Sequence, residues 1–151
     1  MPHIHEKYDF TIAAFLVYKG KVLLVNHPRY DKWLAPGGHI ELNEDPDEAL
    51  FREIEEETGF NDIEVLSSKP KLKERKVLYT PNFVDVHDAN PPHKHISLIY
   101  FARVKHDRHV KSDEHSEARW FSVEELEDPK NNIPVDIIFY SKEAIKLTQN
   151  T

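Results

Sequence analysis

The sequence predicts an α/β fold, in which helices cover a mixed β-sheet, within a single domain spanning residues 1–151. Apolar, β-branched segments precede, separate and follow two helical segments, which is the pattern expected of such a domain. The length corresponds to about one domain, and no repeat, low-complexity tract or Ser/Gly-rich linker divides the chain. The absence of cysteine excludes disulfide scaffolds, cysteine nucleophiles and thiolate metal sites.

A β-hairpin is expected at the beginning of the chain. Residues 10–18 and 21–25 are two apolar runs joined by the short connection Lys19-Gly20. Residues 33–36 then form a short extended piece, which is expected to end in a turn at Gly37-Gly38.

A helix is expected to follow, because both of its ends carry specific signals. Asp45 can act as the N-cap, Pro46 suits the first helical position, and Glu48 has the spacing of a capping box. Gly59 marks the C-terminal end. One side of this helix is apolar and should pack on the sheet, through Ala49, Leu50 and Ile54.

The second half of the chain alternates between extended and irregular segments. Strands are expected at residues 63–66, 95–104 and 118–121, whereas residues 81–94, rich in Pro, His and Asn, are expected to be irregular. The basic run at residues 69–76 is interpreted as a solvated strand face, although it could attract an anionic substrate.

Two helical segments are expected near the C-terminus. Ser122 and Glu125 have the spacing of a capping box for a short helical turn. Residues 134–146 are expected to form the final helix, with Asn131 or Asn132 as its cap, and they carry the apolar residues Ile137, Ile138 and Ile145.

The acidic residues are concentrated in one segment. The formal net charge is −7, and residues 41–57 hold nine carboxylates against a single base, Arg52. An acidic protein of this kind is poorly suited to bind a nucleic-acid backbone, but it can gather divalent cations at one place. Glu53, Glu56 and Glu57 have the i, i+3, i+4 spacing that puts three carboxylates on one helical face.

These like charges destabilise an isolated helix by a few tenths of a kcal/mol per pair, so a compensating partner is expected. Oxygen-preferring divalent cations such as Mg²⁺ are suitable, and Arg52 could orient one of the carboxylates. The alternative interpretation is an acidic helix face that is simply solvated.

Residues 38–60 resemble the Nudix box, Gly-x5-Glu-x7-Arg-Glu-(apolar)-x-Glu-Glu-x-Gly-(apolar), and all nine specified positions match. The preceding Trp33, Pro36 and Gly37 resemble the entry strand of this MutT-like family. Residues 114–121 resemble its later acidic loop and tryptophan strand, so the likeness covers about residues 10–128. The resemblance implies a Nudix-type α/β/α sandwich with a mixed β-sheet.

The resemblance also implies an activity, namely Mg²⁺-dependent hydrolysis of a nucleoside diphosphate linked to another moiety, with Mn²⁺ as a substitute for Mg²⁺. Its implied metal ligands are the Gly37 carbonyl and the carboxylates of Glu53, Glu56, Glu57 and Glu114. Glu53 or Glu114 would take the proton of the attacking water. Arg52 belongs to the implied catalytic set, and three further positions have structural roles: Gly38 in a tight turn, Glu44 in holding the loop, and Gly59 at the helix end. The alternative function is a nucleotide-binding or sensing module of the same fold that turns over weakly.

Four residues outside the box are candidates for substrate binding. Asn132 lies in a stretch resembling the one with which MutT-like members contact a guanine-type base. Trp33 and Phe83 could stack on a base, although core packing is the default role of an aromatic ring, and Arg29 could meet the phosphates.

The expected partner is a small-molecule nucleotide, with nucleic acid disfavoured by the acidic composition. The chain shows no apolar stretch long enough for a membrane span and no signal-peptide pattern, so a cytoplasmic location is expected. The sequence leaves the oligomeric state open, a homodimer included. His87, His93 and His95 indicate a transition-metal site only weakly, because a fourth ligand and a fixed spacing are missing, and pocket-lining or surface roles are favoured.

Overall fold

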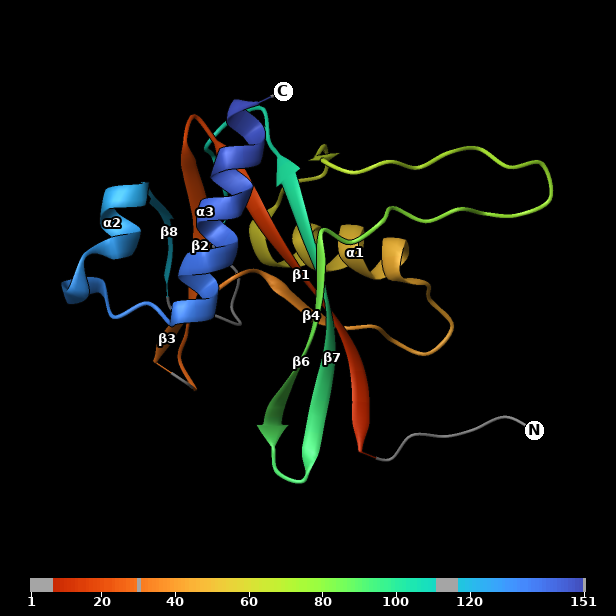
Figure 1. Ribbon diagram of the computed structural model, residues 1–151, viewed down its shortest axis with the longest axis horizontal. Helices are drawn as coiled ribbons and strands as arrows, with labels where there is room; N and C mark the ends of the chain where they lie inside the picture. The colour runs from red at the N-terminus through yellow and green to blue at the C-terminus, as the bar shows by residue number, and fades with distance from the viewer. Residues whose placement is uncertain (1–6, 30, 111–116, 151) are drawn as a thin grey trace.

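A computed structural model describes residues 7–29, 31–110 and 117–150. All of its strands join one eight-stranded sheet with the central order β3-β2-β1-β7-β5 (Figure 1). The strands are β1 (Tyr8–Tyr18), β2 (Lys21–His27), β3 (Lys32–Leu34), β4 (Gly37–His39), β5 (Glu64–Val65), β6 (Phe83–Asn90), β7 (His93–Arg103) and β8 (Glu117–Phe121). The helices are α1 (Pro46–Thr58), α2 (Val123–Glu127) and α3 (Val135–Gln149), with a 3₁₀ turn at Pro129–Asn131.

The centre of the sheet is a parallel pair of long strands. β1 and β7 pair from Tyr8 opposite Lys94 to Val17 opposite Arg103. All other strand pairings are antiparallel. On the edge of β1 that faces away from β7, β1 pairs with β2 at one end and with β4 at the other. On the edge of β7 that faces away from β1, β7 pairs in the same way with β5 and β6. The mixed sheet predicted from the sequence is therefore confirmed.

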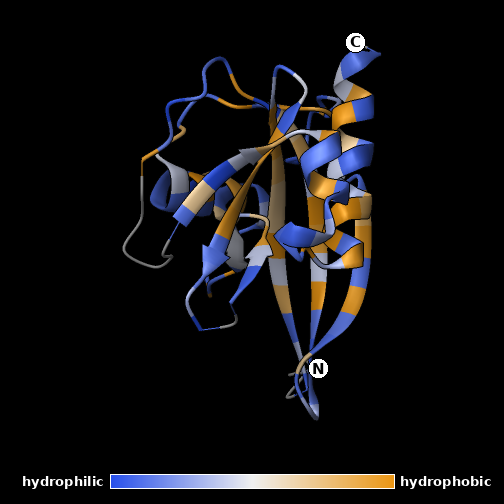
Figure 2. Cartoon of the chain, turned by 90° about the vertical axis from the view of Figure 1, so that its left-hand side faces the viewer, coloured by the Kyte–Doolittle hydropathy of each residue, from blue (hydrophilic) through white to orange (hydrophobic). Residues whose placement is uncertain are grey.

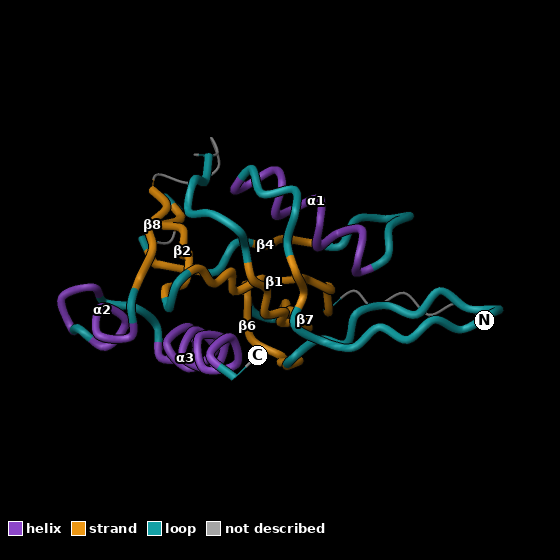
Figure 3. The backbone as a smooth tube through the Cα atoms, turned by 90° about the horizontal axis from the view of Figure 1, so that it is seen from above, coloured by secondary structure: helices purple, strands orange, loops and turns teal. Residues whose placement is uncertain are grey.

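Helices cover both faces of the sheet (Figure 3). Alternate residues of β1 point to opposite faces, so Ile12, Ala14 and Leu16 pack in the same buried cluster as the apolar side of α1. Phe15 and Val17 face the other way and share a buried cluster with α2 and α3. These two cores make the α/β/α sandwich that the sequence predicts, and orange residues mark the middle of the strands in Figure 2.

Local signals place the first elements where the sequence predicts them. Lys19 and Gly20 both have positive φ, 47° and 76°, as a two-residue type I′ hairpin between twisted strands requires. Asp45 and Glu48 form a complete capping box at the start of α1, and Gly59 ends the helix in the left-handed conformation. The capping box of Ser122 that begins α2 is also present.

Residues 81–94 differ from the prediction of an irregular segment. Most of this stretch is β6, which forms a hairpin with β7. Seven of the eight residues of β6 are exposed, because the strand pairs only with β7 among the described residues. Backbone pairing with β7 holds β6 in the sheet. Because β6 lacks a continuous apolar face, its composition did not indicate a strand.

Two further local predictions are wrong. Residues 69–76 form no strand of the sheet but part of a long loop that projects beyond α1 (Figures 1 and 3), because this run lacks the apolar alternation that would pack it on a core. Neither Asn131 nor Asn132 caps α3, which starts after Pro134 without a side-chain cap. Asn131 is occupied elsewhere: its amide donates to the carbonyl oxygen of Glu125 and accepts from Arg119.

Among the described residues, no helix is both long and apolar enough to span a membrane.

Candidate active site

The three carboxylates of the acidic helix face differ in exposure. Glu53 and Glu57 are buried, with 8% and 9% of their surface exposed, although both carry charge-bearing side chains. The Glu56 side chain is 56% exposed. Burying carboxylates costs free energy unless they are hydrogen-bonded or paired with a cation, so the surroundings of Glu53 and Glu57 are informative.

Arg52 is the cation that ties this acidic face together. Its Nη1 donates to Glu53 Oε1 at 3.1 Å and to Glu56 Oε2 at 3.2 Å. Its Nε and Nη2 bind both oxygens of Glu44, at 3.0 and 2.6 Å, and Nη2 also donates to the His39 carbonyl oxygen. One guanidinium therefore contacts three carboxylates, those of Glu44, Glu53 and Glu56. These three carboxylates, Glu57 and Arg52 together have a formal charge of −3.

Glu44 positions Arg52 through a bidentate pair. Its Oε1 also accepts from the backbone N–H of Glu41 at 2.8 Å, which closes the loop before α1. Arg52 holds the pKa of Glu44 below its ordinary range, with help from that N–H. The hydrogen bond to Glu44, followed by the one to Glu53, raises the pKa of Arg52, so the guanidinium stays charged.

Gly37 and Gly38 lie in strand β4, paired with β1, and not in the tight turn predicted for them. Neither has a positive φ; what both positions need is space. A Cβ on Gly38 would lie 2.6 Å from the carboxyl carbon of Glu53, and the Gly37 N–H donates to Glu57 Oε2 at 2.9 Å. Gly38 thus lets β4 approach the Glu53 carboxylate directly, whereas the space that Gly37 needs is against the backbone of β1.

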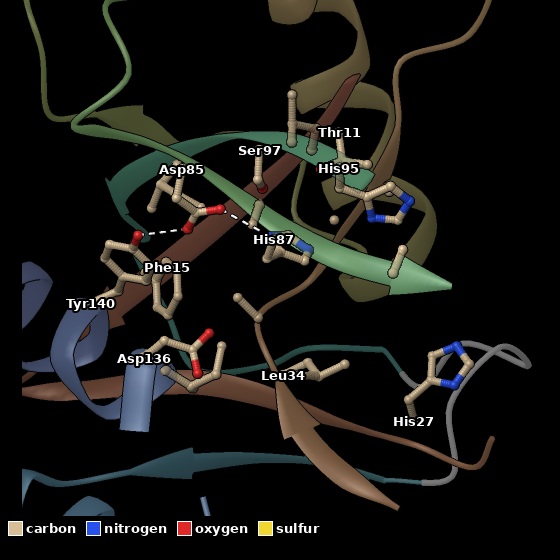
Figure 4. A pocket seen from close by; sticks show the side chains of 18 of the residues that line it. Thr11, Phe15, His27, Leu34, Asp85, His87, His95, Ser97, Asp136 and Tyr140 are labelled. Carbon is tan, nitrogen blue, oxygen red and sulfur yellow. Dashed lines mark hydrogen bonds and ion pairs between the residues drawn. The ribbon is translucent and has the colours of Figure 1, made fainter. Parts of the chain in front are cut away.

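A cavity of about 500 Å³ opens on the other side of β4. Gly37, Gly38 and His39 line one wall, polar side chains from β6, β7 and α3 line another, and residues of β1, β2 and β3 complete the lining (Figure 4). The cavity and the carboxylate cluster therefore meet at the β4 backbone. Four polar residues of the cavity wall were not predicted as site residues from the sequence: Asp85, Ser97, Asp136 and Tyr140.

A chain of hydrogen bonds crosses this cavity wall. Tyr140 donates its hydroxyl to Asp85 Oδ2 at 2.6 Å, and Asp85 Oδ1 lies 2.9 Å from His87 Nδ1 (Figure 4). Burial and the Asp85 carboxylate raise the pKa of Tyr140, so it stays a hydrogen-bond donor. Burial lowers the pKa of His95, and the nearby His39 and His87 lower it further. The alternate positions of Asp85 and His87 on β6 are the sequence signal that could have revealed this wall.

None of the four residues predicted to bind substrate is among the described residues that line the cavity. Trp33 is 8% exposed and packs edge-on against Phe121 in the core, which leaves little ring area for a base. Phe83 packs against Phe101, Phe139 and Tyr140 outside the cavity wall. Core and surface packing explain both aromatic rings.

Arg29 and Asn132 are exposed, and neither is among the described residues that line the cavity. Asn132 has a left-handed backbone and ends the 3₁₀ turn. Glu114 lies outside the described residues. Of the predicted set, the structure therefore gathers Gly37, Gly38, Glu44, Arg52, Glu53, Glu56 and Glu57, while Gly59 ends the same helix.

Comparisons with known proteins agree with this arrangement. The family model for the NUDIX domain matches residues 7–141. A crystal structure of a NUDIX-family hydrolase from Clostridium perfringens is 33% identical, with a TM-score of 0.80 and coverage of 93% of this chain and 97% of that one. An RNA pyrophosphohydrolase of Helicobacter pylori is 30% identical over 138 residues, or 83% of each chain. A probable DHNTP pyrophosphohydrolase of Lactococcus lactis is 35% identical over 57 residues, which cover 38% of this chain and only 34% of that protein.

The α/β/α sandwich, the acidic helix and these relatives define the class of protein as a hydrolase that acts on phosphoanhydride bonds. The chain belongs to the Nudix hydrolase family. The family and enzyme class predicted from the box are thereby confirmed.

Proposed function

We propose that this chain is a Mg²⁺-dependent pyrophosphohydrolase that cleaves a phosphoanhydride bond in a nucleoside diphosphate linked to another moiety. The observation that carries the proposal is the pair of buried carboxylates, Glu53 and Glu57, which lie on the same helix face as Glu56, while Arg52 bonds to Glu53 and Glu56. The neighbouring cavity of about 500 Å³ is large enough for a small-molecule ligand.

The residues present fit a hard divalent cation. Mg²⁺ prefers carboxylate and carbonyl oxygens, and this site offers three carboxylates with excess negative charge. Glu53, Glu56 and Glu57 would hold the ion, with the Gly37 carbonyl and Glu114 as further ligands. When bound, Mg²⁺ supplies neutralisation of phosphate charge and activation of a water molecule.

The residues of the chain itself position this chemistry. Arg52 keeps Glu53 and Glu56 in fixed orientations, and the Gly37 N–H does the same for Glu57. Because β4 lies directly against these carboxylates, substrate phosphates reaching β4 from the cavity arrive next to them. Glu53 or Glu114 then accepts the proton of the attacking water, as a carboxylate general base.

A substrate panel with the full chain and Mg²⁺, read by chromatography of the products, tests the proposal. It contains nucleoside and oxidised-nucleoside triphosphates, ADP-ribose, diadenosine polyphosphates, nucleotide sugars, and capped or triphosphorylated RNA. We expect cleavage of one class, abolished by chelation and reduced at least ~100-fold by Glu56→Gln or Glu57→Gln with unfolding unchanged. Full activity in both variants would refute the metal-cluster mechanism.

The panel also separates hydrolysis from binding alone. Nucleotide binding measured by calorimetry without any product after long incubation would favour the alternative of a sensing module. Comparison of Glu53→Gln with Glu114→Gln at saturating Mg²⁺ assigns the proton acceptor, because loss of a ligand alone is offset by a higher Mg²⁺ concentration whereas loss of the base is not.

A second candidate substrate is the 5′ end of triphosphorylated RNA, although the acidic composition disfavours nucleic acid overall. Two observations support it: the Helicobacter pylori relative is an RNA pyrophosphohydrolase, and the long loop between β5 and β6 is basic. Lys69 and Lys76 anchor this loop to Asp47 and Asp45 at the start of α1, at 3.0 and 2.6 Å. Between these anchors Lys71, Lys73 and Arg75 are exposed.

Charge reversal in the loop distinguishes the two substrates. The triple variant Lys71→Glu, Lys73→Glu, Arg75→Glu should lower kcat/KM for triphosphorylated RNA at least ~10-fold and flatten its salt dependence. Cleavage of free nucleotides should stay unchanged. Equal effects on both substrates, or none on RNA, would exclude the loop as an RNA contact.

A further inference from the structure

A second group of metal-ligating side chains lies at the polar end of the sheet, apart from the carboxylates of α1. Asp9, His93 and His95 each offer one ligand atom, and these atoms all lie within 4.8 Å of one another. In Figure 1 the ends of β1, β6 and β7 extend past α3, and in Figure 2 these strand ends are blue. All three residues are partly exposed rather than buried in the core.

The register of the sheet produces this arrangement. Asp9 of β1 pairs directly with His95 of β7 in the parallel ladder. His93 and His95 are two residues apart on β7 and so point to the same face. His93 Nε2 lies 2.6 Å from Asp9 Oδ2, which makes Asp9 and His93 neighbours as well.

A fourth donor comes from β4. His39 Nε2 lies 3.6 Å from the same Asp9 Oδ2, and the His39 ring meets the His95 ring edge-on at 4.9 Å between centroids. Two imidazoles, those of His93 and His39, thus approach one carboxylate oxygen, and the His95 ring lies edge-on to both of them. The sequence pattern of His87, His93 and His95 lacked two of these donors. Strand pairing brings Asp9 and His39 to His95, whereas His87 bonds to Asp85.

The donor set is chemically different from that of the acidic helix. Imidazole nitrogens with one carboxylate oxygen suit Zn²⁺ and similar first-row transition metals, whereas Mg²⁺ prefers all-oxygen sites. The exposed fractions of the side chains, 31% for His93, 45% for Asp9 and 55% for His39, leave a path for an ion from solvent.

We propose that Asp9, His93 and His95, with His39 as the fourth ligand, form a binding site for a divalent transition-metal ion of the Zn²⁺ type. The site joins β1, β4 and β7 at the rim of the cavity, since His39 and His95 also line that cavity. It is independent of the proposed hydrolysis, because it shares no side chain with the carboxylate cluster.

Zn²⁺ titration by calorimetry of the full, untagged chain in excess Mg²⁺ tests the site, because Mg²⁺ occupies oxygen-only sites. We expect one Zn²⁺ per chain, and Co²⁺ in its place should give the visible absorption of a four-coordinate site. His93→Gln, which retains hydrogen-bonding capacity, and Asp9→Asn should each weaken Zn²⁺ binding at least ~10-fold, since even outer-shell partners contribute roughly that much.

Three controls make the result specific. His106→Ala removes a histidine that instead packs against Phe60, and should leave Zn²⁺ affinity unchanged. Glu56→Gln should also leave it unchanged. The double variant His3→Ala, His5→Ala tests the N-terminal histidines. Thermal unfolding without metal verifies that each variant is folded.

Three outcomes would overturn the proposal. The first is no stoichiometric Zn²⁺ binding in excess Mg²⁺. The second is binding lost in Glu56→Gln but retained in His93→Gln, which would place the ion at the acidic helix. The third is binding lost only when the N-terminal histidines are removed.

Discussion

The two adjacent glycines of β4 should fail in different ways when each is replaced by alanine. A Cβ on Gly37 would meet backbone atoms of β1, lying 2.9 Å from Ala13 Cα and closer still to the Ile12 carbonyl oxygen. The three atoms nearest to a Cβ on Gly38 would all belong to the carboxyl group of Glu53. Gly37→Ala therefore forces two strands apart, whereas Gly38→Ala displaces one carboxylate.

These contacts set the expected magnitudes. Overpacking against backbone that cannot yield costs about 3 kcal/mol for Gly37→Ala, which lowers Tm by roughly 6–12 °C in a chain of this size. For Gly38→Ala the Glu53 carboxyl group must retreat by roughly 1 Å, and such a displacement of a positioned group costs ~10²-fold in turnover. Its stability should fall by no more than ~1 kcal/mol, because a side-chain end moves more easily than a strand.

Thermal unfolding and turnover of the best panel substrate, measured on both variants, test this reasoning. Gly38→Ala should keep a nearly normal Tm with strongly reduced kcat, and Gly37→Ala should lose Tm. A Gly38→Ala enzyme with wild-type turnover would refute the idea that Glu53 must lie against β4. Equal destabilisation by the two substitutions would refute the distinction between backbone and side-chain contact.

Two more substitutions test polar contacts. Because Arg52 lowers the pKa of Glu44 from its ordinary 4.5, their pair stabilises the fold above that pH and is lost as the pH falls through the lower, folded-state pKa. Glu44→Gln should therefore make the free energy of unfolding less pH-dependent between about pH 5 and 3, as urea titrations would show; an unchanged slope would contradict the pairing. Tyr140→Phe removes the hydrogen bond to Asp85 and should lower the free energy of unfolding by about 1 kcal/mol in equilibrium urea denaturation. Wild-type stability in that variant would show that the bond contributes nothing net.

Local signals predicted the elements that depend on neighbouring residues. The Lys19-Gly20 hairpin and the capping box of Asp45 involve residues within four positions of each other, so sequence alone identifies them. The helical face of Glu53, Glu56 and Glu57 follows from spacing in the same way. Gly38 was expected at the right place for the wrong reason, since its need for space comes from α1 and not from a turn.

Contacts between distant segments explain what the sequence could not predict. β6 is a strand because β7 offers it a partner, although its own composition resembles a loop. Trp33 is a core residue because β8 brings Phe121 against it, which no local pattern reveals. The cavity wall of Asp85 and Tyr140 joins residues 55 positions apart.

The parallel pairing of β1 with β7 has a consequence for synthesis of the chain. Residues of β1 are made before those of β7, and the partner edge on β7 is complete only when residue 103 has been made. Until then β2 and β4 can form hydrogen bonds with only one edge of β1, and the edge that later pairs with β7 stays open. A nascent chain therefore carries an open, apolar strand edge from the synthesis of β1 until that of residue 103, and this edge is where aggregation or chaperone binding should be concentrated.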